Sequence, residues 1–347
     1  MLTIGLDVGN GSVCYAIKEA EKSLRKNVYP SAFGIFSAHE QLNLGKTRSS
    51  SDLRVFELGN RSYVLGYKNV QQAQAIPIQT YDRGDRVERA EFKDLVHLAL
   101  LDAATTVETA GFVVELNLAF GVPAEDFRKS VVERIQRWFA EPITGSVNGR
   151  PVGVVVKNLE VLSQPVAVLV DQYLDDNGNV RDAELEHSKV LVVDAGSGTL
   201  DLTEMDGLTI VRQVSLPVGM NDVYRSLLDD LRKVEPKIRC DLFEMETQFR
   251  QAEDSPRFIV KSGRHSAELT KERKEVLQAI TTQMVGAISS EFPDQAHLDR
   301  IILAGGAGRA FASYLRLAIE GIELCADPQL AIAKGLCKYA VSLGVGI

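Results

Sequence analysis

The chain has 347 residues, which suits two ordinary domains, and 45% of them are hydrophobic, so a sizeable core can form. Its net charge of −8 argues against a broad basic surface for nucleic acids. Four cysteines without Cys-x-x-Cys spacing (Cys14, Cys240, Cys325 and Cys337) indicate reduced, mostly buried thiols rather than disulfides or a zinc site. We find no signal-peptide core and no apolar run near the roughly 20 residues that span a bilayer. We therefore expect a cytoplasmic protein without a membrane anchor.

Alternation and turn residues predict strands early in the chain and mixed α/β structure after them. The predicted strands of the first half are Leu2–Leu6, Val13–Ala20, Arg54–Leu58, Arg61–Leu65, Phe112–Phe120, Val152–Val156 and Leu159–Leu162. The predicted helices are Phe92–Thr105, Ala124–Ala140 and Gln164–Tyr173. Residues 37–52 and 69–89 are polar or dense in charge and predict irregular segments, and Asp175–Asn179 predicts a turn between two halves.

The second half repeats the order of strands followed by helices. Its predicted strands are Val190–Val193, Thr199–Met205, Leu208–Ser215 and Arg300–Leu303, with a hairpin over Arg257–Lys261 and His265–Leu269. Its predicted helices are Asn221–Lys233, Leu242–Gln251, Lys271–Ser290, Ala310–Ile319 and Asp327–Ser342. Strands then helices, twice over, predict a mixed α/β protein with two similar lobes and a cleft between them.

One pattern occurs twice, at Ile4–Ser12 and at Leu191–Thr199. Each copy is an apolar strand with an Asp (Asp7 or Asp194), a glycine turn, and a return into a second apolar strand. The turn residues are Gly9, Asn10, Gly11 and Ser12 in the first copy, and Gly196, Ser197, Gly198 and Thr199 in the second. Glycine lets the backbone approach an anion and adopts positive φ cheaply, and turn amides can cradle phosphate oxygens. A single copy is as typical of an ordinary hairpin, but two copies indicate a polyphosphate gripped from both sides, with both aspartates facing a bound metal.

These segments resemble the phosphate-1 and phosphate-2 motifs of the superfamily of actins, sugar kinases and heat-shock-chaperone ATPases. Leu303–Gly308 resembles the adenosine motif, although a plain strand-to-helix turn has the same pattern. Ser163–Ala167 and Ala326–Leu336 resemble the two connecting helices. The resemblance implies an α/β actin-like fold, with two RNase H-like lobes around a nucleotide cleft. Domain I would hold residues 1–163 and 328–347, and domain II residues 164–327.

Two further stretches, Ala119–Pro123 and Leu216–Val223, are similar to segments of bacterial plasmid-segregation actins. The chain therefore resembles the ParM/StbA-type actin-like ATPases most. This resemblance implies a filament-forming protein that binds ATP or GTP with Mg²⁺, hydrolyses it, and moves DNA. Its partners would be other copies of itself and a DNA-binding adaptor; an acidic chain is not expected to bind DNA directly.

The resemblance also implies roles for single residues. Asp7 and Asp194 would serve the metal and catalysis, and Gln164 would position the attacking water, although a polar residue is also common at a helix start. Gly305, Gly306 and Gly308 would lie against the adenosine end of the nucleotide, with Met220 and Asn221 as weaker candidates. Actins carry a Lys seven residues after the first Asp, where this chain has Cys14. Lys18 is near in sequence, but strand alternation does not ensure that it reaches the site.

Three alternatives share the fold. A sugar or acyl kinase would need a base and a substrate pocket, which residues 69–89 could conceal. A chaperone-like ATPase would carry a peptide-binding domain after the last helix. A cell-shape or division scaffold of the MreB or FtsA kind would bind membrane, for which we find no anchor helix.

Overall fold

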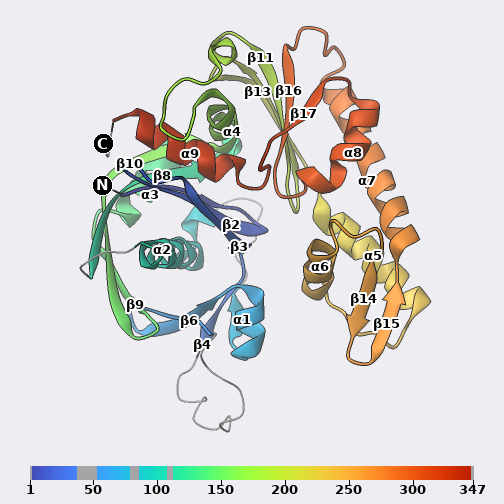
Figure 1. Ribbon diagram of the computed structural model, residues 1–347, viewed down its shortest axis with the longest axis horizontal. Helices are drawn as coiled ribbons and strands as arrows, with labels where there is room; N and C mark the ends of the chain where they lie inside the picture. The colour runs from blue at the N-terminus through green and yellow to red at the C-terminus, as the bar shows by residue number, and fades with distance from the viewer. Residues whose placement is uncertain (1, 37–52, 79–85, 108–111, 345–347) are drawn as a thin grey trace. The chain divides into compact units, whose positions relative to one another are not determined.

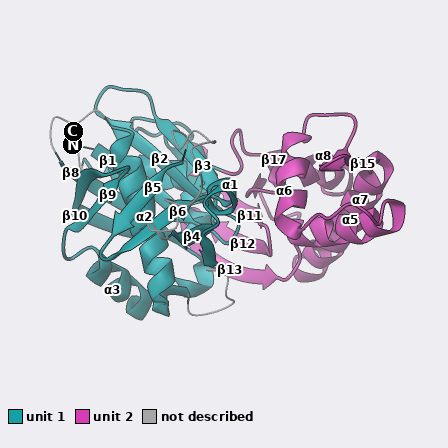
Figure 2. Ribbon diagram, turned by 90° about the horizontal axis from the view of Figure 1, so that it is seen from below, with its two compact units in different colours: residues 1–183, 330–347 teal, residues 184–329 magenta. Residues whose placement is uncertain are grey.

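The computed structural model describes residues 2–36, 53–78, 86–107 and 112–344, and the chain divides into two compact units (Figures 1 and 2). Unit 1 comprises residues 1–183 and 330–347, and unit 2 comprises residues 184–329. The sequence puts the domain boundaries at 163/164 and 327/328, and that assignment stays a prediction. The predicted irregular segment 37–52 lies outside the described residues.

Among the described residues, unit 1 contains a ten-stranded sheet in the order β3-β2-β1-β8-β10-β9-β5-β6-β4-β7. Its strands are β1 (Leu2–Val8), β2 (Ser12–Glu19), β3 (Arg25–Pro30), β4 (Phe33–Phe36), β5 (Val55–Leu58), β6 (Arg61–Leu65), β7 (Ile76–Ile78), β8 (Val113–Val122), β9 (Ile143–Val147) and β10 (Arg150–Ser163). Its helices are α1 (Tyr67–Gln72), α2 (Ala90–Thr105), α3 (Lys129–Trp138), α4 (Gln164–Tyr173) and α9 (Ala331–Ser342), with short 3₁₀ helices η3 (Arg86–Glu88) and η4 (Ala124–Asp126).

Strand β1 shows how the sheet of unit 1 is covered on both faces. Its even-numbered residues, 2 to 8, join the hydrophobic core that α2 completes. Gly5 points the other way, since a Cβ there would lie 2.2 Å from the carbonyl oxygen of Ala333 and 2.4 Å from the amide nitrogen of Cys337, both in α9. Successive side chains of a strand alternate between faces, so Asp7 shares the α9 face with Gly5.

Unit 2 contains a five-stranded sheet in the order β13-β12-β11-β16-β17 and a separate hairpin, among its described residues. Its strands are β11 (Lys189–Ala195), β12 (Leu200–Asp206), β13 (Thr209–Leu216), β14 (Ile259–Ser262), β15 (His265–Glu268), β16 (Arg300–Ala304) and β17 (Ile322–Leu324). Its helices are α5 (Met220–Val234), α6 (Leu242–Gln251), α7 (Thr270–Glu291) and α8 (Gly308–Ala318), and the 3₁₀ helix η5 (Ala183–Glu186) stands at its start. Strands β11, β12 and β16 share one buried core with these four helices.

The two units repeat one strand arrangement. In β3-β2-β1-β8-β10 and in β13-β12-β11-β16-β17, the first three strands are antiparallel neighbours and the last two join in parallel. Both arrangements are the 3-2-1-4-5 order of an RNase H-like lobe. The predicted mixed α/β fold with two similar lobes is confirmed.

Several predicted element boundaries are wrong. The single helix expected over 124–140 is η4, an interruption at Phe127 and Arg128, and then α3. The two strands expected over 152–162 are one strand, β10, with a register shift between Val156 and Asn158. The last helix begins at Ala331 rather than Asp327. Strands β3, β4, β9 and β17 and helix α1 were not predicted, and β7 lies inside the segment expected to be irregular.

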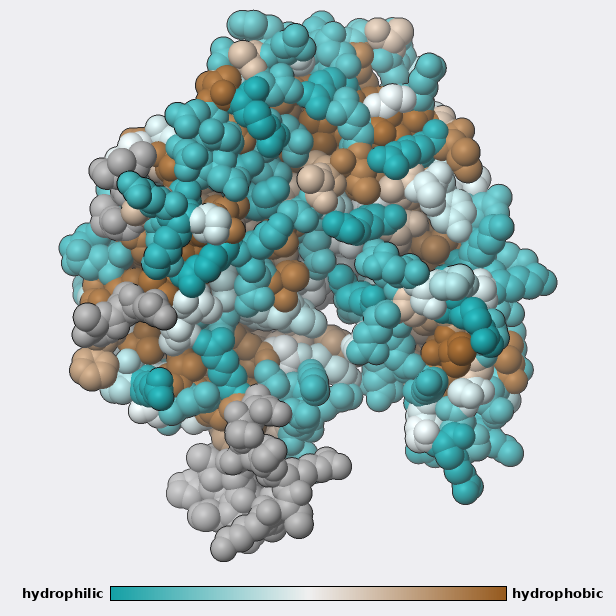
Figure 3. Space-filling view, in the orientation of Figure 1, coloured by the Kyte–Doolittle hydropathy of each residue, from teal (hydrophilic) through white to brown (hydrophobic). Residues whose placement is uncertain are grey.

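Hydrophilic residues dominate the face of the molecule visible in Figure 3, where apolar residues are scattered among them. In the part of the chain that the structure describes, no helix combines the length and apolar character needed to cross a membrane. Cys14, Cys325 and Cys337 are buried, which confirms the prediction of mostly buried cysteines.

Candidate functional site

The two copies of the repeated motif form the same turn. We call Gly9–Ser12, between β1 and β2, turn 1, and Gly196–Thr199, between β11 and β12, turn 2. In turn 1 the Gly9 amide donates to the Ser12 carbonyl at 2.9 Å; in turn 2 the Gly196 amide donates to the Thr199 carbonyl at 2.8 Å. Each bond leaves two residues at the tip of the turn.

Glycine is needed in these turns for space rather than for an unusual backbone. A Cβ on Gly9 would lie 3.2 Å from the Ser12 carbonyl oxygen, and one on Gly196 would lie 3.1 Å from that of Thr199. Neither glycine has a positive φ. The first glycine of each turn is there because any side chain would press on the carbonyl that closes it.

The tip amides of both turns point to an anion site. Within the described residues, the amides of Asn10 and Gly11 in turn 1, and of Ser197 and Gly198 in turn 2, donate to no acceptor. The Asn10 side-chain oxygen is buried and likewise has no hydrogen-bond partner in the described residues. Adjacent unpaired amides form a concavity that attracts negatively charged oxygen atoms.

Asp7 and Gln164, two of the predicted site residues, meet beside turn 1. Asp7 is 6% exposed near the end of β1, and Gln164 is the first residue of α4. The Gln164 side-chain amide donates to the Asp7 carboxylate, with 2.8 Å between Nε2 and Oδ1. Burial raises the pKa of Asp7 to about 6, against the lowering effects of this hydrogen bond and of the Arg86 charge. The carboxylate is thus buried, and the positive charge of a metal ion would stabilise its ionised form.

Arg86 is a member of this site that the sequence analysis missed. It stands in η3, is 8% exposed, and donates to the carbonyl oxygens of Val8 (3.2 Å) and Gly9 (3.3 Å). Its guanidinium carbon lies 4.3 Å from the centre of the Phe92 ring. Burial lowers its pKa to about 10, opposed by the carboxylates of Asp7 and Asp126, so the group is charged at neutral pH. Arg86 falls in a segment expected to be irregular, and nothing in its neighbours signals this contact.

In unit 2, Asp194 lies against the glycine turn that follows β16. Gly305 has φ +90°, and a Cβ there would lie 2.2 Å from the Asp194 Oδ1 atom. The Gly305 amide donates to the Pro328 carbonyl at 2.9 Å. Gly306 and Gly308 are less confined, because a Cβ on each would meet its nearest atom at 3.6 and 3.3 Å. The structure brings together Asp194, turn 2 and the predicted adenosine glycines within this unit.

The first residues of α5 hold the carbonyls of turn 2. The Met220 amide donates to the Gly196 carbonyl at 3.2 Å, and the Asn221 amide donates to the Ser197 carbonyl at 2.7 Å. Gly219 allows this approach, since a Cβ there would lie 2.8 Å from the Ser197 carbonyl oxygen. Met220 and Asn221 therefore contact turn 2 through their backbone.

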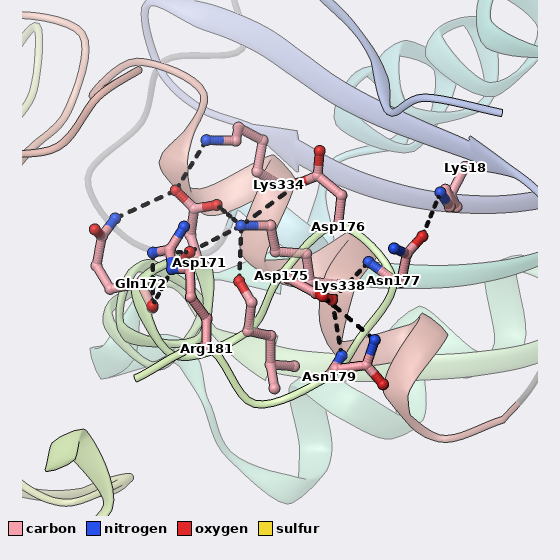
Figure 4. Close-up of polar contacts among 11 residues, drawn as sticks. Lys18, Asp171, Gln172, Asp175, Asp176, Asn177, Asn179, Arg181, Lys334 and Lys338 are labelled. Carbon is pink, nitrogen blue, oxygen red and sulfur yellow. Dashed lines mark hydrogen bonds and ion pairs between the residues drawn. The ribbon is translucent and has the colours of Figure 1, made fainter. Parts of the chain in front are cut away.

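The strand opposite each aspartate differs between the units. In register, Asp7 faces Cys14 on β2, whereas Asp194 faces Asp201 on β12. Asp201 accepts a hydrogen bond from the Thr199 hydroxyl at 2.9 Å, and burial raises its pKa. Lys18 does not replace the missing lysine: its Nζ donates to Asn177 Oδ1 at 2.9 Å (Figure 4) and to the Lys22 carbonyl at 2.8 Å.

A buried ion-pair cluster fixes α4, and so Gln164, against α9 (Figure 4). Asp171 and Lys338 are each 2% exposed, with 2.7 Å between Oδ1 and Nζ, and Lys334 Nζ lies 3.2 Å from the other Asp171 oxygen. Lys338 also donates to the carbonyls of Asp171 (2.9 Å) and Leu174 (3.0 Å), at the end of α4. The helices cross so closely that a Cβ on Gly335 would lie 1.7 Å from the Ala167 carbonyl oxygen.

Each unit presents one carboxylate of the kind that binds a magnesium ion together with phosphate. No group of three or more His, Cys, Asp or Glu side chains arranged to hold a metal occurs among the described residues. Mg²⁺ is usually bound through one or two carboxylates together with substrate phosphates and water. Asp7 and Asp194, each followed within two residues by a turn with unpaired amides, supply ligands of that kind.

Comparison with known proteins identifies the fold. Residues 5–166 match the family described as the N-terminal domain of actin-like proteins. This part of the chain is similar to the actin-like proteins. No curated protein matches its sequence.

Solved structures of actin-like proteins share the fold over nearly the whole chain. The apo pSK41 ParM protein is 21% identical with a TM-score of 0.73, covering 97% of this chain and 96% of its own. An archaeal actin homologue in complex with ADP is 16% identical with a TM-score of 0.71, covering 98% and 99%. A ParM from Clostridium botulinum, in a 15-stranded filament, is 14% identical with a TM-score of 0.69, covering 97% and 98%. The predicted resemblance to ParM-type actins and the actin-like fold are confirmed.

Proposed function

We propose that this actin-like protein binds ATP or GTP with Mg²⁺, hydrolyses it, and assembles into filaments under the control of the bound nucleotide. One observation carries the proposal: an aspartate followed by the same closed turn, with unpaired tip amides, occurs in each unit. An actin-like relative bound to ADP has the same fold, which supports a nucleotide as the ligand.

In the proposed complex, turns 1 and 2 bind the β- and γ-phosphates through their tip amides. Asp7 and Asp194 hold the metal ion, directly or through water, and the ion offsets the charge that develops on the phosphates. Gly305, Gly306 and Gly308 give room for the adenosine end. The positive φ and the tight fit at Gly305 support this assignment, because a side chain there would displace Asp194.

Hydrolysis requires a positioned water molecule, and Gln164 is the proposed positioning group. Its side-chain amide hydrogen-bonds Asp7, which supports a place beside the metal. Catalysis of phosphoryl transfer depends mainly on such positioning and on charge stabilisation. Gln164→Ala should therefore slow hydrolysis by about 10- to 100-fold and leave nucleotide affinity near that of the wild type. The exposed Gln136→Ala is the control, and a wild-type hydrolysis rate in assembled Gln164→Ala would contradict this role.

Filament assembly is the proposed use of the nucleotide. The fold shared with the filament-forming Clostridium botulinum ParM supports it. Sedimentation and electron microscopy with ATP, GTP and each diphosphate test the proposal. We expect triphosphate with Mg²⁺ to drive assembly and hydrolysis to loosen the polymer. Sedimentation that stays flat with both triphosphates over a wide protein range would contradict it, and phosphate transfer to a small molecule would instead indicate a kinase.

DNA segregation in the cytoplasm, through a separate DNA-binding adaptor, is the proposed biological role. The resemblance to plasmid-segregation actins supports it. Direct DNA affinity depends on basic side chains that release counterions, and this chain carries a net charge of −8. We expect no tight DNA binding in gel-shift assays near physiological salt, and capture of a small DNA-binding protein encoded beside this one. Tight binding of the purified protein to duplex DNA would contradict the adaptor.

A further inference from the structure

Turns 1 and 2 are each closed by the same kind of internal hydrogen bond. The groups that donate hydrogen bonds to their other carbonyl oxygens differ between the turns. In turn 2 the donors are the amides of Met220 and Asn221, at the start of the 15-residue helix α5. The start of a helix carries roughly half a positive charge, since its first amides lack partners within the helix. Helix α5 therefore both orients turn 2 and makes the electrostatic potential at the turn more positive.

In turn 1, side chains hold the carbonyls. The Gly9 carbonyl accepts from the Ser31 hydroxyl at 2.6 Å and from Arg86 Nη2 at 3.3 Å. Arg86 Nη1 donates to the preceding carbonyl, that of Val8, at 3.2 Å. The planar guanidinium thus donates to two successive carbonyls at the point where β1 enters turn 1. The compact ammonium group of a lysine is less suited to such a paired contact.

The charge of Arg86 matters as much as its hydrogen bonds. A polyphosphate is strongly anionic, and turn 1 already adjoins the Asp7 carboxylate. The cation that actins place opposite this aspartate is absent, because Cys14 occupies that register. Arg86 is 8% exposed and stacked on Phe92, so its charge is little screened by solvent.

We propose that Arg86 is the positioning residue of turn 1. Its guanidinium turns the Val8 and Gly9 carbonyls away from the ligand, so that the tip amides of Asn10 and Gly11 face the phosphates. It also gives turn 1 the positive charge that α5 gives turn 2. This inference rests on the proposed nucleotide-binding function. It adds one requirement: Arg86 strengthens the binding of the phosphates and not the binding of the adenosine.

The test compares affinities for ATP with Mg²⁺ and for adenosine, by isothermal titration, in wild type and four variants. Arg86→Met removes the charge and keeps an aliphatic side chain. Arg86→Gln keeps a hydrogen-bond donor without the charge, and Arg86→Lys keeps the charge without the planar guanidinium. Arg89→Met removes an exposed cation three residues away and is the matched control. A smaller folded fraction weakens the apparent affinity for both ligands by the same factor, so the ATP-to-adenosine ratio separates this role from a loss of stability.

We expect Arg86→Met to weaken ATP binding about tenfold or more and to leave adenosine binding unchanged, because both the charge and its hydrogen bonds to turn 1 are lost. Arg86→Lys should recover part of the loss, and Arg89→Met should match the wild type. If Arg86→Met does not fold, Arg86→Gln serves with the same expected direction. A wild-type ATP-to-adenosine ratio in the folded neutral variant would overturn the inference. Failure of the wild type to bind ATP would instead overturn the proposed function.

Discussion

Turn 1 and turn 2 are closed by the same backbone hydrogen bond, yet different parts of the chain support them. Turn 2 is held by the helix that starts 21 residues after Thr199, through the amides of Met220 and Asn221. Turn 1 is held by Ser31 and by Arg86, which is 77 residues away from Gly9. The repeated residues of the motif define the turn itself. The groups that donate hydrogen bonds to the carbonyl oxygens of the turn can differ, because any suitably placed donor can form these bonds.

The aspartates also stand in different surroundings. Asp7 is buried and shares its environment with Gln164 and Arg86, whereas Asp194 is less buried and lies against Gly305. The two units thus reach the same chemical arrangement, a carboxylate beside a turn with free amides, by different packing. Substitutions at matched positions in the two units should therefore change ligand affinity by similar amounts and the free energy of unfolding by different amounts.

The largest effect is expected at the two proposed metal ligands, Asp7 and Asp194. Asp194→Ala should abolish hydrolysis and weaken Mg²⁺-nucleotide binding by about 100-fold, because the metal loses a carboxylate ligand. Asp7→Ala should do the same from the other turn. Asp206→Ala, at the exposed end of the neighbouring strand β12, is the control. Hydrolysis by Asp194→Ala at the wild-type rate would break the equivalence of the two turns.

The next effect is one of stability and is confined to unit 1. Lys338→Met leaves the buried Asp171 carboxylate with less compensation and should lower the free energy of unfolding by about 3–5 kcal/mol in urea titrations. Replacing both partners, with Asp171→Leu added, should recover most of this loss. Lys157→Met, which removes a half-exposed partner of Glu115, should change little. A double variant no more stable than Lys338→Met would contradict this account of the cluster.

A smaller loss is expected in unit 2 from a single methyl group. Gly305→Ala should destabilise the protein by about 2 kcal/mol or more, since the residue has positive φ and its Cβ would press on Asp194. Gly306→Ala, with its nearest atom at 3.6 Å, should stay within about 0.5 kcal/mol of the wild type. Thermal melts of the two variants give the comparison. Equal melting temperatures would mean that the Gly305 backbone relaxes without cost.

The smallest expected effect is a gain in stability. The pKa of Asp7 is raised to about 6 from its ordinary 3.8, so the folded chain binds this proton more tightly than the unfolded chain. The group therefore favours folding most below pH 4, and this advantage is lost as pH rises through about 6. Asp7→Asn should stabilise the nucleotide-free protein by about 2 kcal/mol at pH 8 while weakening nucleotide binding. A stability difference that does not change between pH 4 and pH 8 would contradict the buried carboxylate as its source.

Local patterns predicted much of this molecule. Helices α4 and α6 have the predicted bounds, because polar residues and Pro165 mark the start of one and Asp241 caps the other. Strand β17 was missed because it is short, and β3 was missed because it lies at a sheet edge, mostly exposed, without apolar alternation. The two glycine turns were found because each places its residues within nine positions.

Contacts between distant segments could not be predicted in the same way. Arg86 reaches turn 1 only because the chain returns to the sheet through η3, and its sequence neighbours resemble those of a solvated loop. The same is true of Lys18, whose partner Asn177 is 159 residues away. Gln164 was proposed as a site residue from its place at the start of a connecting helix, which is a local signal, whereas its contact with Asp7 could not be predicted from the sequence.

The most direct test of the central claim is hydrogen–deuterium exchange of the two turns with one nucleotide. The claim is that turn 1 and turn 2 bind the same polyphosphate through their tip amides. Peptides covering residues 9–12 and 196–199 should both become protected when Mg²⁺ and a slowly hydrolysed ATP analogue are added, and neither should change with adenosine. Protection of one turn alone, or of neither while the nucleotide binds, would contradict it.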